Sequence, residues 1–272
     1  MATTGESYVL GYSRHERERL VRQAALHRVD SAAFLDQIGL RPGWRALDVG
    51  CGPLGVLDLL AERVGPGGEV VGVDQEEQTL AMARDFAAEQ GLANVRLVRG
   101  DARATGLPRD AFDLAHARLV LVTVPDPARI LAELVALVRP GGVVAVQDID
   151  VVSWCCEPTH PSFDALLGAF LALRREGGQD SHLGRRLRGL LRAAGLTGVE
   201  MVVRARAQGT GGVVQSQLPT IARGIRDAAV ARGLFTAEEF AAHQAALDAH
   251  LADPETITVS SLMFQVWGRK PA

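Results

Sequence analysis

The chain has 272 residues, of which 47% are hydrophobic and 22% are charged, so it can bury a full core as an ordinary globular protein. A formal net charge of -3 without a long basic run gives no electrostatic signature for nucleic acid, and the apolar runs are far too short to cross a bilayer. We therefore expect one large domain, or one domain with a cap, and no nucleic-acid or membrane partner.

The amino-terminal sequence lacks a basic-then-apolar signal pattern, which predicts a cytoplasmic protein. The three cysteines, Cys51, Cys155 and Cys156, have neither the pattern of a disulfide framework nor a metal-ligand spacing. Histidines in the carboxyl-terminal half are scattered without ligand spacing. We expect reduced thiols and no metal site, and the sequence leaves the oligomeric state open.

Short apolar runs alternate with helical patterns between residues 44 and 150. Near-continuous apolar strands separated by helices predict a parallel sheet covered on both faces, which is a doubly wound α/β domain. One helix is expected to end at Gly91 and another at Pro140–Gly142. The expected strands lie within residues 44–50, 69–74, 95–101, 112–121 and 143–150.

The pattern changes after Asp150. Residues 162–194 predict two helices broken at Gly177 and Gly178, and residues 198–209 predict a strand. These elements extend the α/β core toward the carboxyl terminus.

An alanine-rich segment, residues 214–252, predicts two helices that are split at Gly233. Thr236 and Glu239 form a capping box where the second helix begins. Residues 257–270 then return to strand character. The helical pair between the last two strands is expected to lie over the carboxyl edge of the sheet as a lid.

Gly50, Gly52 and Gly55 form a G-x-G-x-x-G loop directly after the first expected strand. Such a loop lets the backbone approach a ligand, which can be a dinucleotide or another adenosine compound. Asp48 precedes the loop, and a carboxylate beside a pyrophosphate would be repelled. A ligand with a cationic end tolerates that acid.

Two further acids end the next strands. Asp74 follows Gly50 by 74 − 50 = 24 residues, where a carboxylate can accept hydrogen bonds from ribose hydroxyls. Asp101 and Ala102 end the third strand, where a carboxylate can accept the amino group of adenine and a backbone N–H can meet a ring nitrogen. These positions outline an adenosine without phosphates, and a dinucleotide explains neither Asp48 nor Asp101.

These motifs, together with "FDLAHARLVLVTVPDP" and "VRPGGVV", resemble the class I S-adenosylmethionine-dependent methyltransferases over roughly residues 44–150. The resemblance implies a seven-stranded sheet with an antiparallel last strand, S-adenosylmethionine as cofactor and a small-molecule acceptor. The ends of the chain further resemble natural-product and ubiquinone-type methyltransferases. With this resemblance, we expect the chain to consist of a helical lid (1–43), a cofactor-binding core (44–150) and remaining core strands with a substrate cap (151–272).

The residues expected to bind the cofactor are Asp48, Gly50, Gly52, Asp74, Gln75, Asp101, Ala102 and Arg118. Asp48 either orders the loop or reaches the amino-acid end of the cofactor through water. Arg118 faces the cofactor carboxylate or the substrate, or it pairs with an acid such as Asp148. His116 is expected to be a hydrogen-bonded core histidine, and Cys51 a small filler beneath the loop.

The acceptor side has weaker signals. Asp148 and Asp150 end the fifth strand, where one of them either faces the substrate or caps the following loop. Trp154 either walls an apolar pocket or packs under the cap. Related chains often carry histidine where this one has Thr123, so a general base is missing there.

A polar-aromatic segment precedes the domain and can fold over the cofactor. The candidate catalytic residues are Tyr12, His15 and Asp150, and the candidate substrate contacts are Tyr8, Asp148 and Trp154. Methyl transfer is an in-line displacement that depends mainly on alignment and exclusion of water, so no nucleophile triad is needed. Two other functions stay open: a cofactor-binding enzyme that catalyses cyclisation or elimination, and a cofactor-sensing binding protein.

Overall fold

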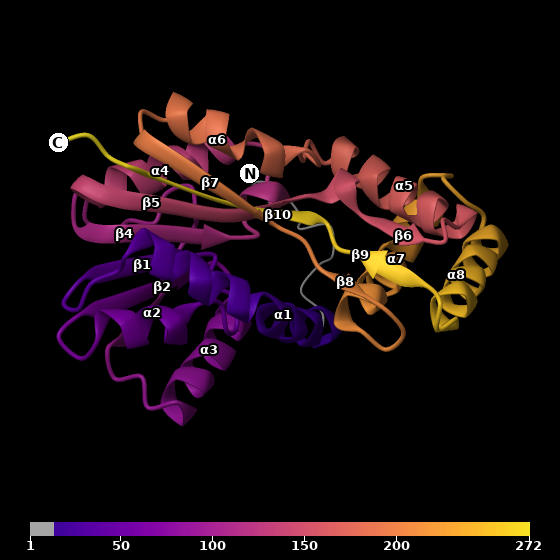
Figure 1. Ribbon diagram of the computed structural model, residues 1–272, viewed down its shortest axis with the longest axis horizontal. Coiled ribbons are helices and arrows are strands. Elements are labelled where there is room, and N and C mark those ends of the chain that lie inside the picture. The colour runs from indigo at the N-terminus through magenta and orange to yellow at the C-terminus, as the bar shows by residue number, and fades with distance from the viewer. Residues whose placement is uncertain (1–13) are drawn as a thin grey trace, which may run out of the picture.

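A seven-stranded sheet forms the centre of the computed structural model, which describes residues 14–272, with side chains from residue 19 onward (Figure 1). The strands run in the order β3-β2-β1-β4-β5-β10-β7, and β10 is antiparallel to both of its neighbours, β5 and β7. The predicted fold class and the antiparallel last strand are confirmed. The strands of this sheet are β1 (Arg45–Val49), β2 (Glu69–Asp74), β3 (Val95–Arg99), β4 (Phe112–Arg118), β5 (Val138–Asp150), β7 (Thr197–Arg204) and β10 (Leu262–Arg269).

Helices cover both faces of the sheet, as the apolar strands require. One face packs against α2 and α3 together with the carboxyl-terminal half of α1, and the other packs against α4 and α6 (Figure 1). The helices are α1 (Arg14–Ile38), α2 (Leu57–Val64), α3 (Glu77–Glu89), α4 (Pro127–Leu137), α5 (Pro161–Glu176), α6 (Leu183–Ala193), α7 (Val213–Ala231) and α8 (Ala237–Ala252).

The sequence predicted where two helices end, at Gly91 and at Pro140–Gly142. Gly91 follows the end of α3 with a φ of 66°, a left-handed conformation that glycine adopts without strain. The expected end of α4 at Pro140–Gly142 is wrong, because α4 ends at Leu137 and β5 begins at Val138. Residues 138–142 are the first residues of β5, where Gly141 has a φ of 75° and the register with β4 shifts, so the proline and glycines mark an irregular strand entry and not a helix cap.

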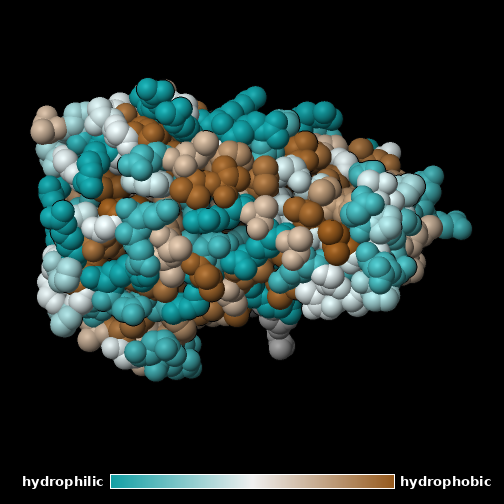
Figure 2. Space-filling view, in the orientation of Figure 1, coloured by the Kyte–Doolittle hydropathy of each residue, from teal (hydrophilic) through white to brown (hydrophobic). Residues whose placement is uncertain are grey.

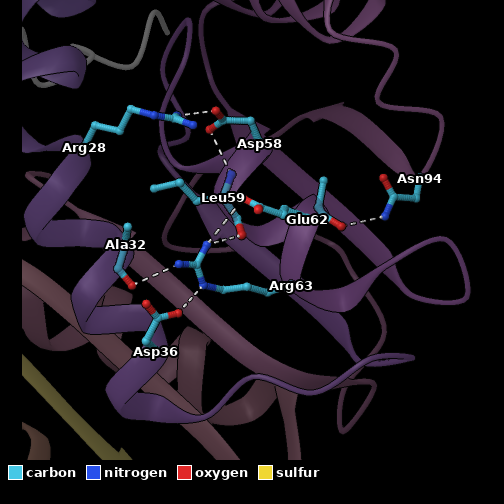
Figure 3. A network of polar contacts seen from close by, with 9 residues as sticks. Arg28, Ala32, Asp36, Asp58, Leu59, Glu62, Arg63 and Asn94 are labelled. Atoms are coloured by element: carbon cyan, nitrogen blue, oxygen red, sulfur yellow. Dashed lines mark hydrogen bonds and ion pairs between the residues drawn. The ribbon is translucent and has the colours of Figure 1, made fainter.

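The helix α1 is fastened to α2 by a polar cluster on the surface (Figure 3). Arg28 forms an ion pair with Asp58, and Arg63 donates hydrogen bonds to Asp36 Oδ1 at 2.8 Å and to the carbonyl of Ala32 at 3.2 Å. Exposed ion pairs each contribute little, about 0 to 1 kcal/mol. They add to the apolar packing of Phe34, Leu35 and Ile38, which are buried in the core and place α1 against the domain.

A cap lies beyond the carboxyl ends of the parallel strands (Figure 1). It consists of α5, α7 and α8 with a small antiparallel sheet in the order β6-β9-β8, which the sequence did not predict. Its strands are β6 (Cys155–Glu157), β8 (Ala207–Gln208) and β9 (Ile257–Val259). The predicted break between α7 and α8 and the capping box at Thr236 and Glu239 are confirmed.

The outer surface is a mosaic of hydrophilic and hydrophobic patches on the face in Figure 2. The edge strand β7 exposes Met201 and Val203 by 42% and 39%, and scattered apolar side chains of this kind are normal on globular proteins. From residue 14 to residue 272, no helix is long and apolar enough to cross a membrane.

Candidate functional site

A cavity of about 670 Å³ lies between the carboxyl ends of the sheet strands, the helix α1 and the cap. Ligands of open α/β sheets bind at this edge, so the cavity is the candidate site. Every residue expected to bind the cofactor lies in its wall. These are Asp48, Gly50, Gly52, Asp74, Gln75, Asp101, Ala102 and Arg118.

Asp74 holds the glycine loop and the start of α3 at the end of β2. Its Oδ2 accepts a hydrogen bond from the backbone N–H of Gly52 at 3.0 Å, and its Oδ1 accepts one from the N–H of Glu76 at 3.0 Å. Burial raises the pKa of the Asp74 carboxyl, and the backbone donors oppose that shift. Each carboxylate oxygen can accept a second hydrogen bond from a ligand in the cavity.

Two glycines of the loop have no room for a side chain, and a third has open space beside it. A Cβ at Gly50 would lie 2.3 Å from Val120 Cγ2, and one at Gly55 would lie 2.3 Å from the carbonyl oxygen of Cys51. Gly52 has a φ of 61°, and a Cβ built on it meets no described atom within 4 Å. Gly52 therefore leaves open a cradle in the cavity wall into which a ligand can press against the backbone.

Asp101 at the end of β3 is bound by a neighbour that the sequence reasoning did not foresee. The guanidinium of Arg103 donates to Asp101 Oδ1 at 3.0 Å and to Oδ2 at 2.9 Å, and the Arg103 N–H donates to Oδ1 at 2.8 Å. These hydrogen bonds hold the pKa of Asp101 below its usual range. A ligand amino group would share this carboxylate with Arg103.

Asp48 belongs to a buried polar network. Gln147 Oε1 accepts hydrogen bonds from Ser31 Oγ at 3.1 Å and from Gln265 Nε2 at 2.9 Å, so its amide nitrogen donates to His116 Nε2 at 2.8 Å. The proton of His116 is then on Nδ1, which donates to Asp48 Oδ1 at 2.7 Å. The network connects α1, β1, β4, β5 and β10 and fixes the Asp48 carboxylate.

Two residues were expected to pack and not to react. His116 is fully buried and hydrogen-bonded through both ring nitrogens, which confirms the prediction of a core histidine. Cys51 is buried beneath the loop, where burial and then the charge of Asp48 raise the pKa of its thiol. A thiol held protonated in this way is a small filler, as predicted.

Arg118 reaches from β4 to the glycine loop. Its Nη1 donates to Ser31 Oγ at 3.0 Å and its Nη2 donates to the carbonyl of Gly55 at 2.8 Å. None of the ion pairs formed by the described residues joins Arg118 to Asp148, the alternative that the sequence left open. The guanidinium lines the cavity beside Asp48, which places opposite charges near one another at that end of the site.

Asp148 does not lie in the cavity wall, contrary to the expected substrate contact. Its Oδ2 accepts a hydrogen bond from the N–H of Val122 at 3.0 Å, and its Oδ1 accepts one from the N–H of Ile149 at 3.0 Å. Burial raises the pKa of Asp148 to about 7. The carboxyl orders the short helix η1 (Leu121–Thr123) after β4 and is not part of the cavity wall.

Asp150 also points away from the cavity, so its expected catalytic role is not supported. It is fully buried and forms an ion pair with Arg185 of α6, and its Oδ1 lies 3.9 Å from His182 Nδ1. The residue between the two acids, Ile149, lines the cavity. The sequence showed that acids follow the strand but not which side chains would face the ligand.

Trp154 both lines the cavity and packs under the cap, where its ring meets Phe163 edge-on with centroids 6.3 Å apart. Tyr8 and Tyr12 lie outside the described residues. His15 lies in the first turn of α1, and its side chain is outside the described part of the chain. The predicted roles of these three residues stay predictions.

One face of α1 lines the cavity and was missed by the sequence reasoning. Arg19, Gln23 and His27 recur every four residues and all lie in the wall, together with Leu20 and Ala24. Burial, followed by the charges of Arg118 and Arg206, lowers the pKa of His27 to about 3, so its imidazole is neutral at pH 7. The i, i+4 spacing of polar residues was the available signal.

The cap contributes two polar residues that were also missed. Gln179 Nε2 donates to the carbonyl of Thr123 at 2.8 Å, and Arg174 donates to the carbonyl of Val122 and to Ser181 Oγ. Both side chains line the cavity. Within residues 14–272, no cluster of three or more histidine, cysteine or acidic side chains could hold a metal ion.

Comparison with known proteins adds a family to this geometry. Residues 40–175 match a family model described as a methyltransferase domain. The chain is 36% identical to nocamycin O-methyltransferase of Saccharothrix syringae, over 50% of this chain and 56% of that protein. It is 32% identical to demethylmenaquinone methyltransferase of Geobacillus sp. (strain WCH70), over 56% of this chain and 61% of that protein. The matches thus span little more than half the length of these curated relatives.

Solved structures show the same fold at low sequence identity. The YcgJ protein from Bacillus subtilis superposes with a TM-score of 0.60 at 19% identity, covering 89% of this chain and 99% of that one. Phosphoethanolamine N-methyltransferase 2 of Haemonchus contortus, solved with phosphomonomethylethanolamine and S-adenosylhomocysteine, superposes with a TM-score of 0.55 at 18% identity. That alignment covers 88% of this chain and 52% of the other.

Proposed function

This chain belongs to the methyltransferase domain family, and from that premise we propose that it transfers a methyl group from S-adenosylmethionine to a small-molecule acceptor. The observation that carries the proposal is the meeting of Asp74, Asp101 and the Gly52 cradle in the wall of one cavity. We further propose a secondary-metabolite acceptor, which the likeness to nocamycin O-methyltransferase supports.

The residues present fit S-adenosylmethionine. Asp74 would bind the ribose hydroxyls, and Asp101 with the backbone of Ala102 would bind the adenine. Arg118 would meet the cofactor carboxylate while Asp48, held by its hydrogen bond from His116, would face the amino-acid end. Opposite charges side by side suit a zwitterion, whereas the diphosphate of a dinucleotide would meet a buried carboxylate there.

When bound, S-adenosylmethionine supplies an electrophilic methyl group on a sulfonium centre. The chain itself holds the acceptor close to that end of the cavity and excludes water with α1, the cap and the apolar side chains around Trp154. Neutral His27 lies in the same wall, where its imidazole can accept a hydrogen bond from the acceptor, but a pKa of about 3 makes it a weak base, so the acceptor proton would pass to solvent. We propose that residues 1–43 act as the lid and that residues 151–272 supply the remaining core strands together with the cap that binds the acceptor.

Calorimetry with S-adenosylmethionine and S-adenosylhomocysteine tests the cofactor site. We expect Asp74→Ala to weaken both affinities at least about tenfold, because two ligand hydrogen bonds and the order of the glycine loop are lost. Asp85→Ala is the matched control, since Asp85 is an exposed acid on the adjacent helix α3. No binding by the wild type, or equal affinities in the two variants, would refute the site.

Mass spectrometry then tests the reaction. Acceptors incubated with the wild type and S-adenosylmethionine should gain one methyl group while S-adenosylhomocysteine accumulates. A product of unchanged mass would instead indicate a cyclase or an elimination enzyme. Binding without turnover across a broad acceptor panel would indicate a cofactor-sensing protein.

A further inference from the structure

The strand β7 forms one outer edge of the seven-stranded sheet. Its partner in that sheet is β10, and no other described strand lies on its second side (Figure 1). An extended edge with free backbone N–H and C=O groups is a template for another strand, and proteins often block such an edge with proline or lysine. The eight residues of β7 contain neither, and their charges are one glutamate and one arginine.

These two charged side chains have no ion-pair partner among the described residues. They are Glu200, which is exposed, and Arg204, which is half-buried. The two residues stand four positions apart in an extended strand, about 13 Å, so they cannot form an ion pair with one another within one chain. An ion pair between them requires a second copy of the strand.

A second copy of β7 can pair antiparallel with the first across a two-fold axis perpendicular to the sheet. Such an axis keeps each face of the sheet on its own side, so each residue lies opposite one that points to the same face. Because side chains alternate along a strand, even-numbered residues then oppose even-numbered ones, and odd oppose odd. In every allowed register, one residue therefore lies on the axis opposite itself.

One of these registers matches the sequence of β7. With Val202 on the axis, Glu200 of each copy lies opposite Arg204 of the other. In the same register, Met201 lies opposite Val203. An axis through Glu200 or Arg204 would instead place like charges opposite one another, which is unfavourable. An axis through any other residue of the strand pairs no opposite charges within it.

The apolar residues of β7 suit the same arrangement. Met201 and Val203 are 42% and 39% exposed and lie opposite Val266 and Phe264 of β10. Phe264 packs against α6 at Gly184, so these side chains belong to the face that α6 covers. One exposed apolar side chain is ordinary, but pairing across the axis would continue this apolar face into the second copy.

The opposite edge strand, β3, lacks this self-complementarity. Its charged residues are Arg96 and Arg99, and Arg96 forms an ion pair with Glu69 of β2. No register of β3 with a second copy of itself brings opposite charges together within the strand. The sheet thus has one edge that matches its own copy and one that does not.

We propose that two copies of the chain associate through β7, antiparallel and with Val202 on the two-fold axis, so that their sheets form one continuous sheet. No residue of β7, all of which are described, lines the cavity, so the pairing leaves the cavity wall of each copy intact. The association goes beyond the proposed methyl transfer and does not depend on it.

Analytical ultracentrifugation of the full chain tests the association, and we expect a monomer–dimer equilibrium for the wild type. Glu200→Arg should raise the dimer dissociation constant about tenfold or more, because two opposite-charge pairs become like-charge pairs. Arg204→Glu should have the same effect. Glu200→Arg combined with Arg204→Glu restores both pairs and should return the dissociation constant to within about threefold of the wild type.

Glu89→Arg is the matched control, since it makes the same charge change at an exposed acid at the end of α3 and should leave the dissociation constant unchanged. Circular dichroism and urea denaturation establish that each variant is folded. A wild type that stays monomeric at millimolar chain concentration would overturn the proposal. A dimer that folded Glu200→Arg leaves intact, or a folded double variant that stays dissociated, would do the same.

Cross-linking tests the register. In a Cys155→Ser background, which removes the exposed thiol, Val202→Cys places a thiol on the axis beside its own copy, and a short bis-maleimide should join the two chains. Thr197→Cys is the control on the same strand, because its two thiols would lie ten residues apart, about 33 Å. Equal yields from the two variants, or no product from a Val202→Cys sample that sediments as a dimer, would overturn the pairing.

Discussion

The two ends of the cavity are built in different ways. At the cofactor end, the polar groups satisfy one another through the backbone and near neighbours, as Asp74 does with the N–H groups of Gly52 and Glu76. At the cap end, side chains from distant segments meet, and Trp154 and Gln179 keep polar atoms without partners. One end is preorganised by its own hydrogen bonds, whereas two buried polar atoms at the other end lack partners among the described residues.

The largest expected effect comes from removing the centre of the buried network at the cofactor end. His116→Leu leaves the buried Asp48 carboxylate without its 2.7 Å hydrogen bond, which we expect to lower the free energy of unfolding by about 3 kcal/mol. Urea denaturation measures the change. His243→Leu in the cap, where the partly exposed imidazole bonds to Ser162 Oγ, should cost less than about 1 kcal/mol. Equal losses of unfolding free energy in the two variants would mean that the buried network at the cofactor end is no more important for stability than a hydrogen bond in the cap.

The next effect separates backbone strain from contact with a ligand. Gly52 and Gly91 both have positive φ, 61° and 66°, and a Cβ on either meets no described atom within 4 Å. Alanine should therefore destabilise both proteins by about 1 kcal/mol. Only Gly52→Ala should also weaken S-adenosylmethionine binding in calorimetry, by about tenfold or more, because its methyl group would fill the cradle. Similar affinities in both variants would remove Gly52 from the site.

This contrast explains what the sequence could predict. Asp74 and Asp101 stand at the ends of two successive apolar strands, so the local sequence pattern alone places them at one edge of a parallel sheet. Gln179 meets Thr123 across 56 residues, and no local pattern records that contact. Asp148 and Asp150 show the same limit, because alternation along a strand does not tell which side chains face the cavity.

The fold was predictable for a related reason. Parallel strands buried on both faces and the glycine ends of helices are local signals, and they were sufficient for the core sheet. In the small β6-β9-β8 sheet of the cap, β8 and β9 lie inside the expected strands 198–209 and 257–270, but no local pattern shows that these strands break and pair with β6. His27 had a signal in the four-residue repeat of α1, but its lowered pKa depends on burial by distant segments and then on the charges of Arg118 and Arg206.

A smaller effect concerns pH. Because His27 has a pKa of about 3 in the folded chain and about 6.5 when unfolded, the unfolded state binds more protons between these values. The contribution of neutral His27 is thus fully present above pH 6.5 and is lost as the pH falls toward 3, by at most about 1.4 kcal/mol per pH unit. His27→Gln should flatten the fall in stability between pH 6.5 and 5 measured by urea denaturation. The contribution of Asp148 to stability changes with pH in the opposite direction, since its pKa is raised to about 7. Asp148 is therefore a poor control position, and we choose His243→Gln, which replaces a histidine of the cap by the same residue.

An unchanged pH profile in His27→Gln would show that burial and the charges of Arg118 and Arg206 do not lower the pKa of His27. An imidazole with an ordinary pKa is a stronger base than one with a pKa of about 3. Activity should be measured over the same pH range. We expect no loss of activity caused by protonation of His27 above pH 5, because its pKa is about 3.

The smallest effect tests whether the cap can be loosened without disturbing the cofactor end. Thr236 Oγ1 accepts from the Glu239 N–H at 3.1 Å and the Thr236 N–H donates to Glu239 Oε2 at 2.7 Å, so Thr236→Ala should cost about 1 kcal/mol at the start of α8. Thr220→Ala, inside the helix α7, should be neutral or slightly stabilising because alanine has the higher helix propensity. Both variants should bind S-adenosylmethionine as the wild type does in calorimetry. A loss of cofactor affinity in Thr236→Ala alone would show that the cap and the cofactor end are coupled, and that the division drawn between them is too sharp.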